Sequence, residues 1–306
     1  NAVGLEKNPG FKITAKMGFM LAVGVIYGDL AMRLLYATRP YEKNKGEAQA
    51  VLDSWYDRIV ENVLHYNKKD YYANIKGIVE DFDKIERLDI EKPKVGVVGE
   101  ILVKYHPNAN NNIVDTIEAE GGEAVVLDLL DFFLYGMVNK KFNFEHLSGS
   151  WSSMKINELA IKGVEWLRKP MRAALAESEH YTEPAHIEHT AEAASQIISI
   201  GNQCGEGWLL TGEMVELIHG GVENIVCLQP FACLPNHITG EGMVHKLHSA
   251  YPEAVFLALD CDASASEANQ ANRLKLMMSA LTEKSESKDD LSFVRKTVSL
   301  RKGTAL

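Results

Sequence analysis

Residues 224–237, NIVCLQPFACLPNH, join an apolar run to a loop that holds a cysteine between two prolines. The run at 224–229 is short, rich in branched apolar residues and followed by Pro230, so it predicts a buried strand that ends at the proline. The loop then places Cys233 close to an aromatic ring and to His237. It is either a ligand loop or a packed corner, and we favour a ligand loop scaffolded by a packed corner.

The same alternation of strand and helix extends outward from this segment. A second apolar run at 254–260 follows it after a helical stretch, and the runs at 94–103 and 123–129 flank a helical stretch at 110–121. Strands that alternate with helices are typical of parallel-sheet proteins. The predicted fold is therefore α/β, with two Rossmann-like parallel-sheet lobes and additional helices.

Helical periodicity elsewhere divides the chain into five parts. Apolar residues recur at helical spacing through residues 12–90 and again through 151–176. The predicted parts are an N-terminal helical region (3–92), a first α/β lobe (93–150), a helical connection (151–186), a second α/β lobe (187–282) and a charged tail (283–306).

Composition favours a soluble, cytoplasmic protein. The 306 residues are 46% hydrophobic and 24% charged, and the formal net charge of −10 argues against a nucleic-acid surface, which is usually basic. The apolar stretch at 17–28 is shorter than the roughly 20 residues that span a bilayer, so it predicts a buried helix and no membrane contact. Four cysteines are too few for a disulfide scaffold.

Three cysteine-bearing loops are expected at one edge of the second lobe. Ligands of open parallel sheets bind outside the carboxyl ends of the strands, and thiolates suit iron–sulfur clusters or zinc. The loops carry Cys204 (GNQCGEG, 201–207), Cys233, and Cys261 (LDCDASASE, 259–267). Cys227 lies inside a predicted strand, which favours a core role, and the aspartates on both sides of Cys261 disfavour a thiolate there.

Two other polar groups have simpler interpretations. A histidine patch at His180, His186 and His189 is better explained as a solvated turn than as a metal site. A polar row could bind a small molecule between metal-free lobes, but it fits the solvated face of the last helix better; it consists of Asn269, Gln270, Asn272 and Arg273.

The chain also resembles a known family. The strings GNQCGEGWLLTGEM (201–214), NIVCLQPFACLPNHITGEGM (224–243), ASEANQANRLKLM (265–277) and GDLAMRLLYATRPYE (28–42) are similar to the C-terminal region of the large acyl-CoA dehydratase activase-related proteins. These proteins belong with the 2-hydroxyacyl-CoA dehydratase components, a group that includes 2-hydroxyglutaryl-CoA dehydratase and benzoyl-CoA reductase subunits.

The resemblance implies two α/β lobes that hold a [4Fe-4S] or related cluster between them, with electrons supplied by an ATP-hydrolysing activase. Carried over by position, Cys233 is the best match to a cluster ligand, Cys204 a second and Cys227 a weaker third. The first lobe, 93–150, departs from the pattern because it has no cysteine. The missing ligands would then lie upstream of this chain, or the chain binds no cluster alone.

Two functional hypotheses follow. The first is an iron–sulfur redox module of an ATP-driven electron-transfer system, with Asn236 and His237 in contact with the ligand shell. Its expected partners are upstream domains of a larger chain or an ATPase activase module, an acyl-CoA substrate and possible further copies of the chain, and the chain alone is not expected to be an active enzyme. The second is a non-catalytic docking or regulatory module without a complete cluster.

Overall fold

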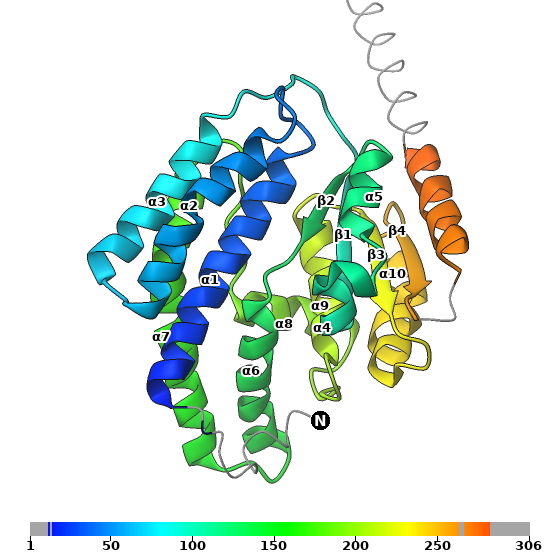
Figure 1. Ribbon diagram of the computed structural model, residues 1–306. Coiled ribbons are helices and arrows are strands. Elements are labelled where there is room, and N and C mark those ends of the chain that lie inside the picture. The colour runs from blue at the N-terminus through cyan, green and yellow to red at the C-terminus, as the bar shows by residue number, and fades with distance from the viewer. Residues whose placement is uncertain (1–11, 13, 263–265, 282–306) are drawn as a thin grey trace, which may run out of the picture. The chain divides into compact units, whose positions relative to one another are not determined.

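The computed structural model describes residue 12, residues 14–262 and residues 266–281 (Figure 1). The chain folds as two compact units, one from residues 1–89 and 126–216 and the other from residues 90–125 and 217–306. The chain therefore passes from one unit to the other three times. The predicted tail, 283–306, and the first residues of the predicted helical region lie outside the described residues.

The first unit is helical. Helices α1, α2 and α3 contact one another, and α7 contacts α1, α3 and α6 (Figure 1). The helices are α1 (Ala15–Thr38), α2 (Glu47–Leu64), α3 (Lys68–Asp83), α6 (Leu130–His146), α7 (Trp151–Glu177), α8 (Ile187–Ile197) and most of α9 (Trp208–His219).

Helix α1 provides much of the core of this unit. Its side chains Val23, Ile26, Leu30 and Leu34 are fully buried and belong to one apolar cluster with residues of α3, α6 and α7. By length and a mean hydropathy of 1.5, α1 is the one helix in the described ranges that could also cross a membrane, a test that core helices of soluble proteins pass as well. The helix predicted at 17–28 is confirmed as part of α1, but only Val23, Ile26 and Tyr27 of this stretch are buried, and Met17 and Leu21 are exposed.

A buried polar network fixes the start of α6 against α1. Asp29 of α1 accepts hydrogen bonds from the backbone N–H groups of Leu129 (2.8 Å) and Leu130 (3.0 Å). Leu129 is the N-cap of α6 and has no capping side chain, so the Asp29 carboxylate satisfies N–H groups that the helix leaves unpaired. Burial, with the nearby charge of Asp128, raises the pKa of Asp29 well above its ordinary value.

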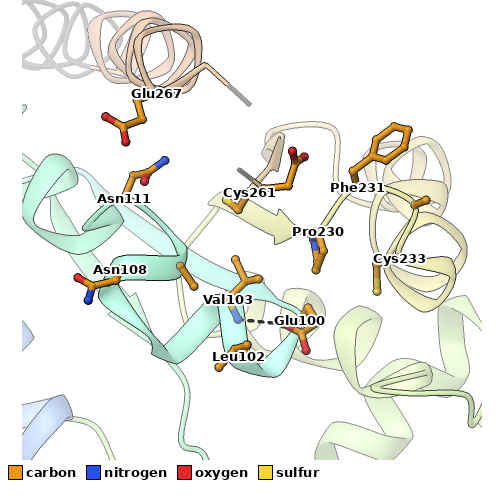
Figure 2. Close-up of a pocket in the computed structure, with 13 residues that line it drawn as sticks. Glu100, Leu102, Val103, Asn108, Asn111, Pro230, Phe231, Cys233, Cys261 and Glu267 are labelled. Atoms are coloured by element: carbon orange, nitrogen blue, oxygen red, sulfur yellow. Dashed lines mark hydrogen bonds between the residues drawn. The ribbon is translucent and has the colours of Figure 1, made fainter. Parts of the chain in front are cut away.

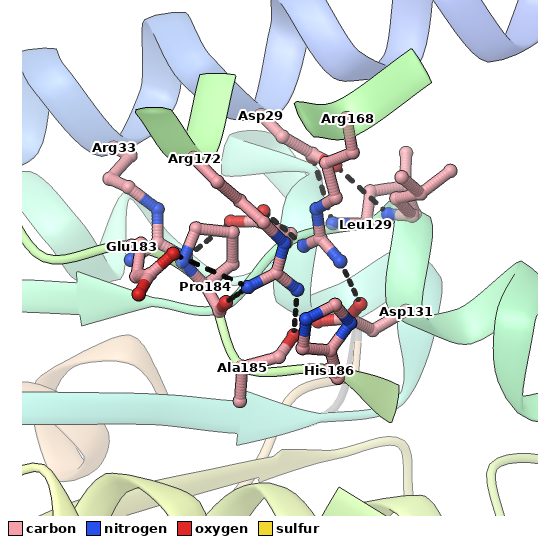
Figure 3. Close-up of polar contacts among 12 residues, drawn as sticks. Asp29, Arg33, Leu129, Asp131, Arg168, Arg172, Glu183, Pro184, Ala185 and His186 are labelled. Atoms are coloured by element: carbon pink, nitrogen blue, oxygen red, sulfur yellow. Dashed lines mark hydrogen bonds and ion pairs between the residues drawn. The ribbon is translucent and has the colours of Figure 1, made fainter. Parts of the chain in front are cut away.

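Two arginines neutralise the neighbouring aspartates (Figure 3). Asp128 accepts a hydrogen bond from Arg33 at 2.6 Å and another from Arg168, which also donates to Asp131 at 2.8 Å. Burial acts to raise the pKa of Asp128, but the two guanidinium charges outweigh it and the pKa is lowered. Removing Arg168 would leave the buried Asp131 carboxylate without its ion-pair partner, so the network helps to specify how these helices pack.

The second unit contains a four-stranded parallel sheet in the order β2-β1-β3-β4. Its strands are β1 (Lys94–Gly99), β2 (Glu123–Val126), β3 (Asn224–Gln229) and β4 (Val255–Asp260). Its helical segments are α4 (Ile101–Tyr105), η2 (Pro107–Ala109), α5 (Ile113–Ala119), η3 (Asn236–Gly240), η4 (Glu241–Met243), α10 (Val244–Ala250) and residues 267–281.

The two central strands are buried along almost their whole length. In β1 every residue from Val95 to Gly99 is buried, and in β3 every residue after Asn224. Continuous burial is expected of parallel strands that are covered on both faces. Gly96 leaves room for the side chain of Leu217, since a Cβ at this glycine would lie 2.6 Å from it.

The α/β class is confirmed, but the strands are not divided between two sheets. Parallel pairing of β1 with β3 puts Val95 opposite Asn224 and Gly99 opposite Leu228, so strands of both predicted lobes share one sheet. Two short strands per lobe would leave long apolar edges unpaired, and joining them satisfies those backbone groups.

The ends of two predicted strands and one further helix also differ from the predictions. The strand predicted at 94–103 ends at Gly99, because the Glu100 carboxylate accepts the N–H of Val103 and begins α4. The predicted strand 123–129 ends at Val126, since Asp128 enters the polar network. Helix α6 was not predicted, because its capping group, Asp29, comes from a distant part of the sequence.

Replacing Gly99 by alanine is expected to destabilise the sheet. Gly99 has φ of +148°, and a Cβ there would lie 2.1 Å from the carbonyl oxygen of Leu228 on the paired strand. Backbone must therefore move, and urea unfolding should show a loss of about 3 kcal/mol or more. The matched control is Gly136→Ala in α6, where a Cβ meets nothing within 4 Å. It should be neutral or gain about 0.5–1 kcal/mol, and an equal loss in both variants would contradict the close approach at Gly99.

The first unit should lose stability as pH rises through the titration of Glu216. Burial, together with Asp131, raises the pKa of Glu216 from 4.5 to about 7, although Thr190 donates a hydrogen bond to it at 2.5 Å. A carboxyl with a raised pKa binds its proton more tightly in the folded state, so its contribution is full below pH 4.5 and is lost by about pH 7.

Glu216→Gln should remove roughly 1–3 kcal/mol of that decline, measured as the free energy of unfolding at pH 5 and pH 8. Glu188→Gln, an exposed glutamate of α8, is the control and should keep the wild-type pH dependence. An unchanged decline in the Glu216 variant would rule out this assignment.

Candidate functional site

The order of the strands creates a crevice at the carboxyl edge of the sheet. The chain runs from β1 toward β2 on one side and from β3 toward β4 on the other, so the loops after β1 and β3 diverge. Such a switch point is the usual ligand site of open parallel sheets. Gly99 and Leu228 are paired at this point, and Gln229 is paired with Asp260 at the end of β4.

A cavity of about 750 Å³ lies at this edge (Figure 2). Every lining residue belongs to the second unit. The loop after β1 and the segment that follows it contribute one wall, the loop after β3 another, and the residues after β4 a third. The lining consists of Glu100, Leu102, Val103, Asn108, Ala109, Asn111, Pro230, Phe231, Ala232, Cys233, Cys261, Asp262 and Glu267.

The loop after β3 turns sharply to present Cys233 to the cavity. Ala232 has φ of +59°, a left-handed conformation that is rare for alanine, and the N–H of Cys233 bonds back to the carbonyl of Pro230 at 3.1 Å. The following η3 is a π-helix, a form that is frequent at functional sites. The predicted ligand loop therefore does border a cavity, with a turn and a π-helix holding it.

Asn236 connects the Cys233 sulfur to the interior. Its side-chain Nδ2 donates a hydrogen bond to Cys233 Sγ at 3.2 Å, and the residue is fully buried. An N–H donor stabilises a thiolate and tunes the potential of any metal bound to it. Asn236 Oδ1 is buried and has no hydrogen-bond partner among the described residues.

His237 contacts a carboxylate of the segment that follows the loop. Its Nδ1 lies 3.1 Å from Glu241 Oε2, which also accepts a hydrogen bond from Gln229 Nε2 at 2.8 Å. The bond from Gln229, followed by that from His237, holds the pKa of Glu241 below its ordinary value. Gln229 donates to Asp260 as well, at 3.1 Å, so these side chains tie the loop to the ends of β3 and β4.

The four cysteines have distinct positions. Cys233 and Cys261 line the cavity. Cys227 is buried within β3 between Val98 and Ala258 of the neighbouring strands and does not line the cavity. Cys204 is exposed in the turn before α9 and belongs to the first unit.

Cys261 is a poor thiolate despite its place in the cavity. Burial, and then the carboxylates of Asp260 and Asp262, raise its pKa to about 11. This agrees with the expectation that flanking aspartates disfavour ionisation there. In the described part of the chain, no group of three or more His, Cys, Asp and Glu side chains has an arrangement that could hold a metal ion.

The cavity walls are acidic. Three of the lining residues carry carboxylates, Glu100, Asp262 and Glu267, and among the residues that the structure describes none that lines the cavity is Lys, Arg or His. The Glu100 carboxylate also accepts the N–H of Val103 at 2.9 Å, which fixes it at the rim. Such walls favour neutral or cationic ligand groups and repel phosphates.

The sequence did not predict that Asn108 and Asn111 line one wall of the cavity. Asn111 has φ of +55°, and its Nδ2 donates to Gln270 Oε1 at 2.7 Å, while Gln270 Nε2 donates to the backbone carbonyl of Asp260. The run NANNN at 108–112 was a signal, because asparagine tolerates left-handed turns. Gln270 is thus buried and bonded, whereas Asn269, Asn272 and Arg273 are exposed, as a solvated face predicts.

Comparisons of this chain with protein-family models, with curated proteins and with solved structures give no significant match.

Thiol reagents of opposite charge should react with Cys233 at different rates, because the cavity walls are acidic. In a Cys204→Ser protein, Cys233 should react about tenfold faster with a trimethylammonium methanethiosulfonate than with the sulfonate analogue, after correction for free cysteine. Mass spectrometry of the labelled peptides measures both rates, and Cys261 should react slowly because its pKa is about 11.

Glu267→Gln should reduce this preference severalfold. The control is Glu253→Gln, an exposed glutamate before β4 at the amino edge of the sheet. Equal rates for both reagents in the Cys204→Ser protein without a further substitution would show that the carboxylates do not set the electrostatic potential at Cys233.

Proposed function

We propose that this chain is part of an iron–sulfur redox protein related to the 2-hydroxyacyl-CoA dehydratase components and their activases, with a role in ATP-driven low-potential electron transfer. The observation that carries this proposal is the thiol of Cys233 on the wall of the switch-point cavity, with an amide N–H directed at its sulfur. Soft thiolate ligands with such N–H contacts are the usual means by which proteins hold and tune iron–sulfur clusters.

The residues of the cavity do not form a complete ligand set by themselves. Cys233 is a suitable ligand, but Cys261 is held protonated, Cys227 is inside β3 and Cys204 belongs to the first unit. A cubane cluster is usually held by four cysteines. Cys233 would therefore provide one ligand, and the others would come from groups outside this unit, such as upstream domains of a larger chain.

The remaining roles belong to this same proposal. An ATPase activase module would supply the electron, the system would work in the cytoplasm, and an acyl-CoA thioester would be the substrate of the complete assembly. Because Glu100, Asp262 and Glu267 repel phosphates, the nucleotide end of the CoA would bind outside the cavity. The two-lobed arrangement of the dehydratase components is also proposed for the assembly rather than for the single sheet of this chain.

Anaerobic reconstitution with iron and sulfide tests the assignment of Cys233. The wild-type chain, alone and with an upstream region supplied, should be compared with Cys233→Ser by visible absorption, EPR and iron counting. We expect the variant to lose at least about tenfold in cluster occupancy, because a hydroxyl is a far poorer ligand than a thiolate for iron–sulfur clusters.

The matched control is Cys227→Ala, which removes a buried sulfur of the same sheet and should retain the cluster. Asn236→Leu removes the N–H···S bond and should shift the reduction potential while iron content stays constant. A full cluster in Cys233→Ser would overturn the assignment. Absence of any cluster in both wild-type preparations would favour the non-catalytic docking or regulatory module.

A further inference from the structure

Helix α7 has a second apolar face in addition to the one that packs in the first unit. Met154, Ile161, Arg168 and Leu175, seven residues apart, are buried on the side that meets α1, α3 and α6. Residues at this spacing lie on one side of a helix.

The other side carries apolar residues in the pattern of a coiled-coil seam. Ile156, Leu159, Gly163 and Trp166 are spaced by three, four and three residues, which matches alternating a and d positions of a heptad. Ile156 is 67% exposed, Leu159 71% and Trp166 50%. A Cβ placed on Gly163 meets nothing within 4 Å, so there is room at the centre for an incoming side chain. We call these four residues the α7 stripe.

A column of lysines borders the stripe on one side. Lys155, Lys162 and Lys169 are seven residues apart and exposed, at the positions labelled g when Ile156 is an a position. Glu158 lies beside this column: Lys155 donates a hydrogen bond to it at 2.7 Å, and that bond, followed by the charges of Lys155, Lys141 and Lys162, lowers the pKa of Glu158. The chain as a whole has a formal charge of −10, so this basic column is a local exception.

We propose that the α7 stripe docks a helix of a partner protein whose apolar heptad seam is bordered by aspartates and glutamates. The stripe supplies the a and d side chains, and Lys155, Lys162 and Lys169 pair with the partner's flanking carboxylates. Trp166 has the largest side chain of the α7 stripe and serves as its anchor, because aromatic side chains of this size dominate helix-in-groove binding.

Charge decides between this partner and a second copy of the chain. In an antiparallel pair of α7 helices, g positions face g positions and lysines would oppose lysines. In a parallel pair they would face the e positions Ser153, Ala160 and Leu167, which have no negative charge. The carboxylates of an acidic partner would form ion pairs with the three lysines, whereas a second copy of α7 offers them no negative charge.

The same pattern favours a protein helix over a membrane. The basic residues form a column on one side of the stripe, whereas helices that lie in a membrane surface carry them across the whole polar face. The net charge of −10 would also repel an anionic bilayer. This inference uses residues of the first unit alone, and the proposed function uses Cys233 of the second, so each can fail separately.

A synthetic helix provides the probe. Two fluorescein-labelled peptides of three heptads, identical at a and d, carry glutamate at e and g in one case and lysine in the other. Fluorescence anisotropy with the full chain at low salt should show at least tenfold tighter binding of the glutamate peptide. Lys155→Glu, Lys162→Glu and Lys169→Glu together should reverse the preference.

Leu159→Asn should weaken binding at least tenfold, while the control Leu276→Asn, a 74% exposed leucine of the second unit, should not change it. Circular dichroism melting of both variants confirms that they fold. Equal binding of the two peptides, or equal loss in both leucine variants, would overturn the proposal. So would concentration-dependent dimerisation, or sedimentation with phosphatidylserine vesicles, that Leu159→Asn abolishes, since these would assign the stripe to a second copy or to a membrane.

Discussion

Parallel pairing between β1 and β3 is the interaction on which the candidate site depends. It joins residues 94–99 to residues 224–229, more than a hundred positions apart, and it places the loops after both strands at one edge. Gly99 permits the close approach of the two strand ends, since any side chain there would meet the Leu228 carbonyl. The cavity, its acidic rim and the position of Cys233 all follow from this contact.

The sequence was sufficient to predict the elements that are coded locally. Short apolar runs identified β1 and β3, helical periodicity identified α1 and α7, and the prolines around Cys233 identified a constrained loop. The sequence was not sufficient to predict which strands pair with each other. Period and composition describe which residues are buried, whereas the choice of neighbouring strand depends on tertiary contacts, so one sheet was mistaken for two lobes.

The same limit explains which site residues were found. The constrained loop of Cys233 was predicted because its chemistry is local, and a poorly acidic Cys261 was expected from two adjacent aspartates, although burial is the larger cause. Asn111 and Glu267 were missed, since they reach the cavity only through a left-handed turn and the fold of the last helix. Asp29 lies in a largely apolar helix, and its burial is explained only by α6, because its carboxylate accepts hydrogen bonds from the N–H groups at the start of that helix.

The threefold passage of the chain between the two units governs how the protein can be synthesised and divided. Neither unit is a continuous stretch, so a ribosome that has produced α1, α2 and α3 must still deliver α6 and α7 before their apolar faces are covered. Likewise β1 leaves the ribosome long before β3 and must remain soluble in the interval. No single cut liberates an intact unit, and preparing either one as an independent protein requires new covalent joins between segments that are distant in sequence.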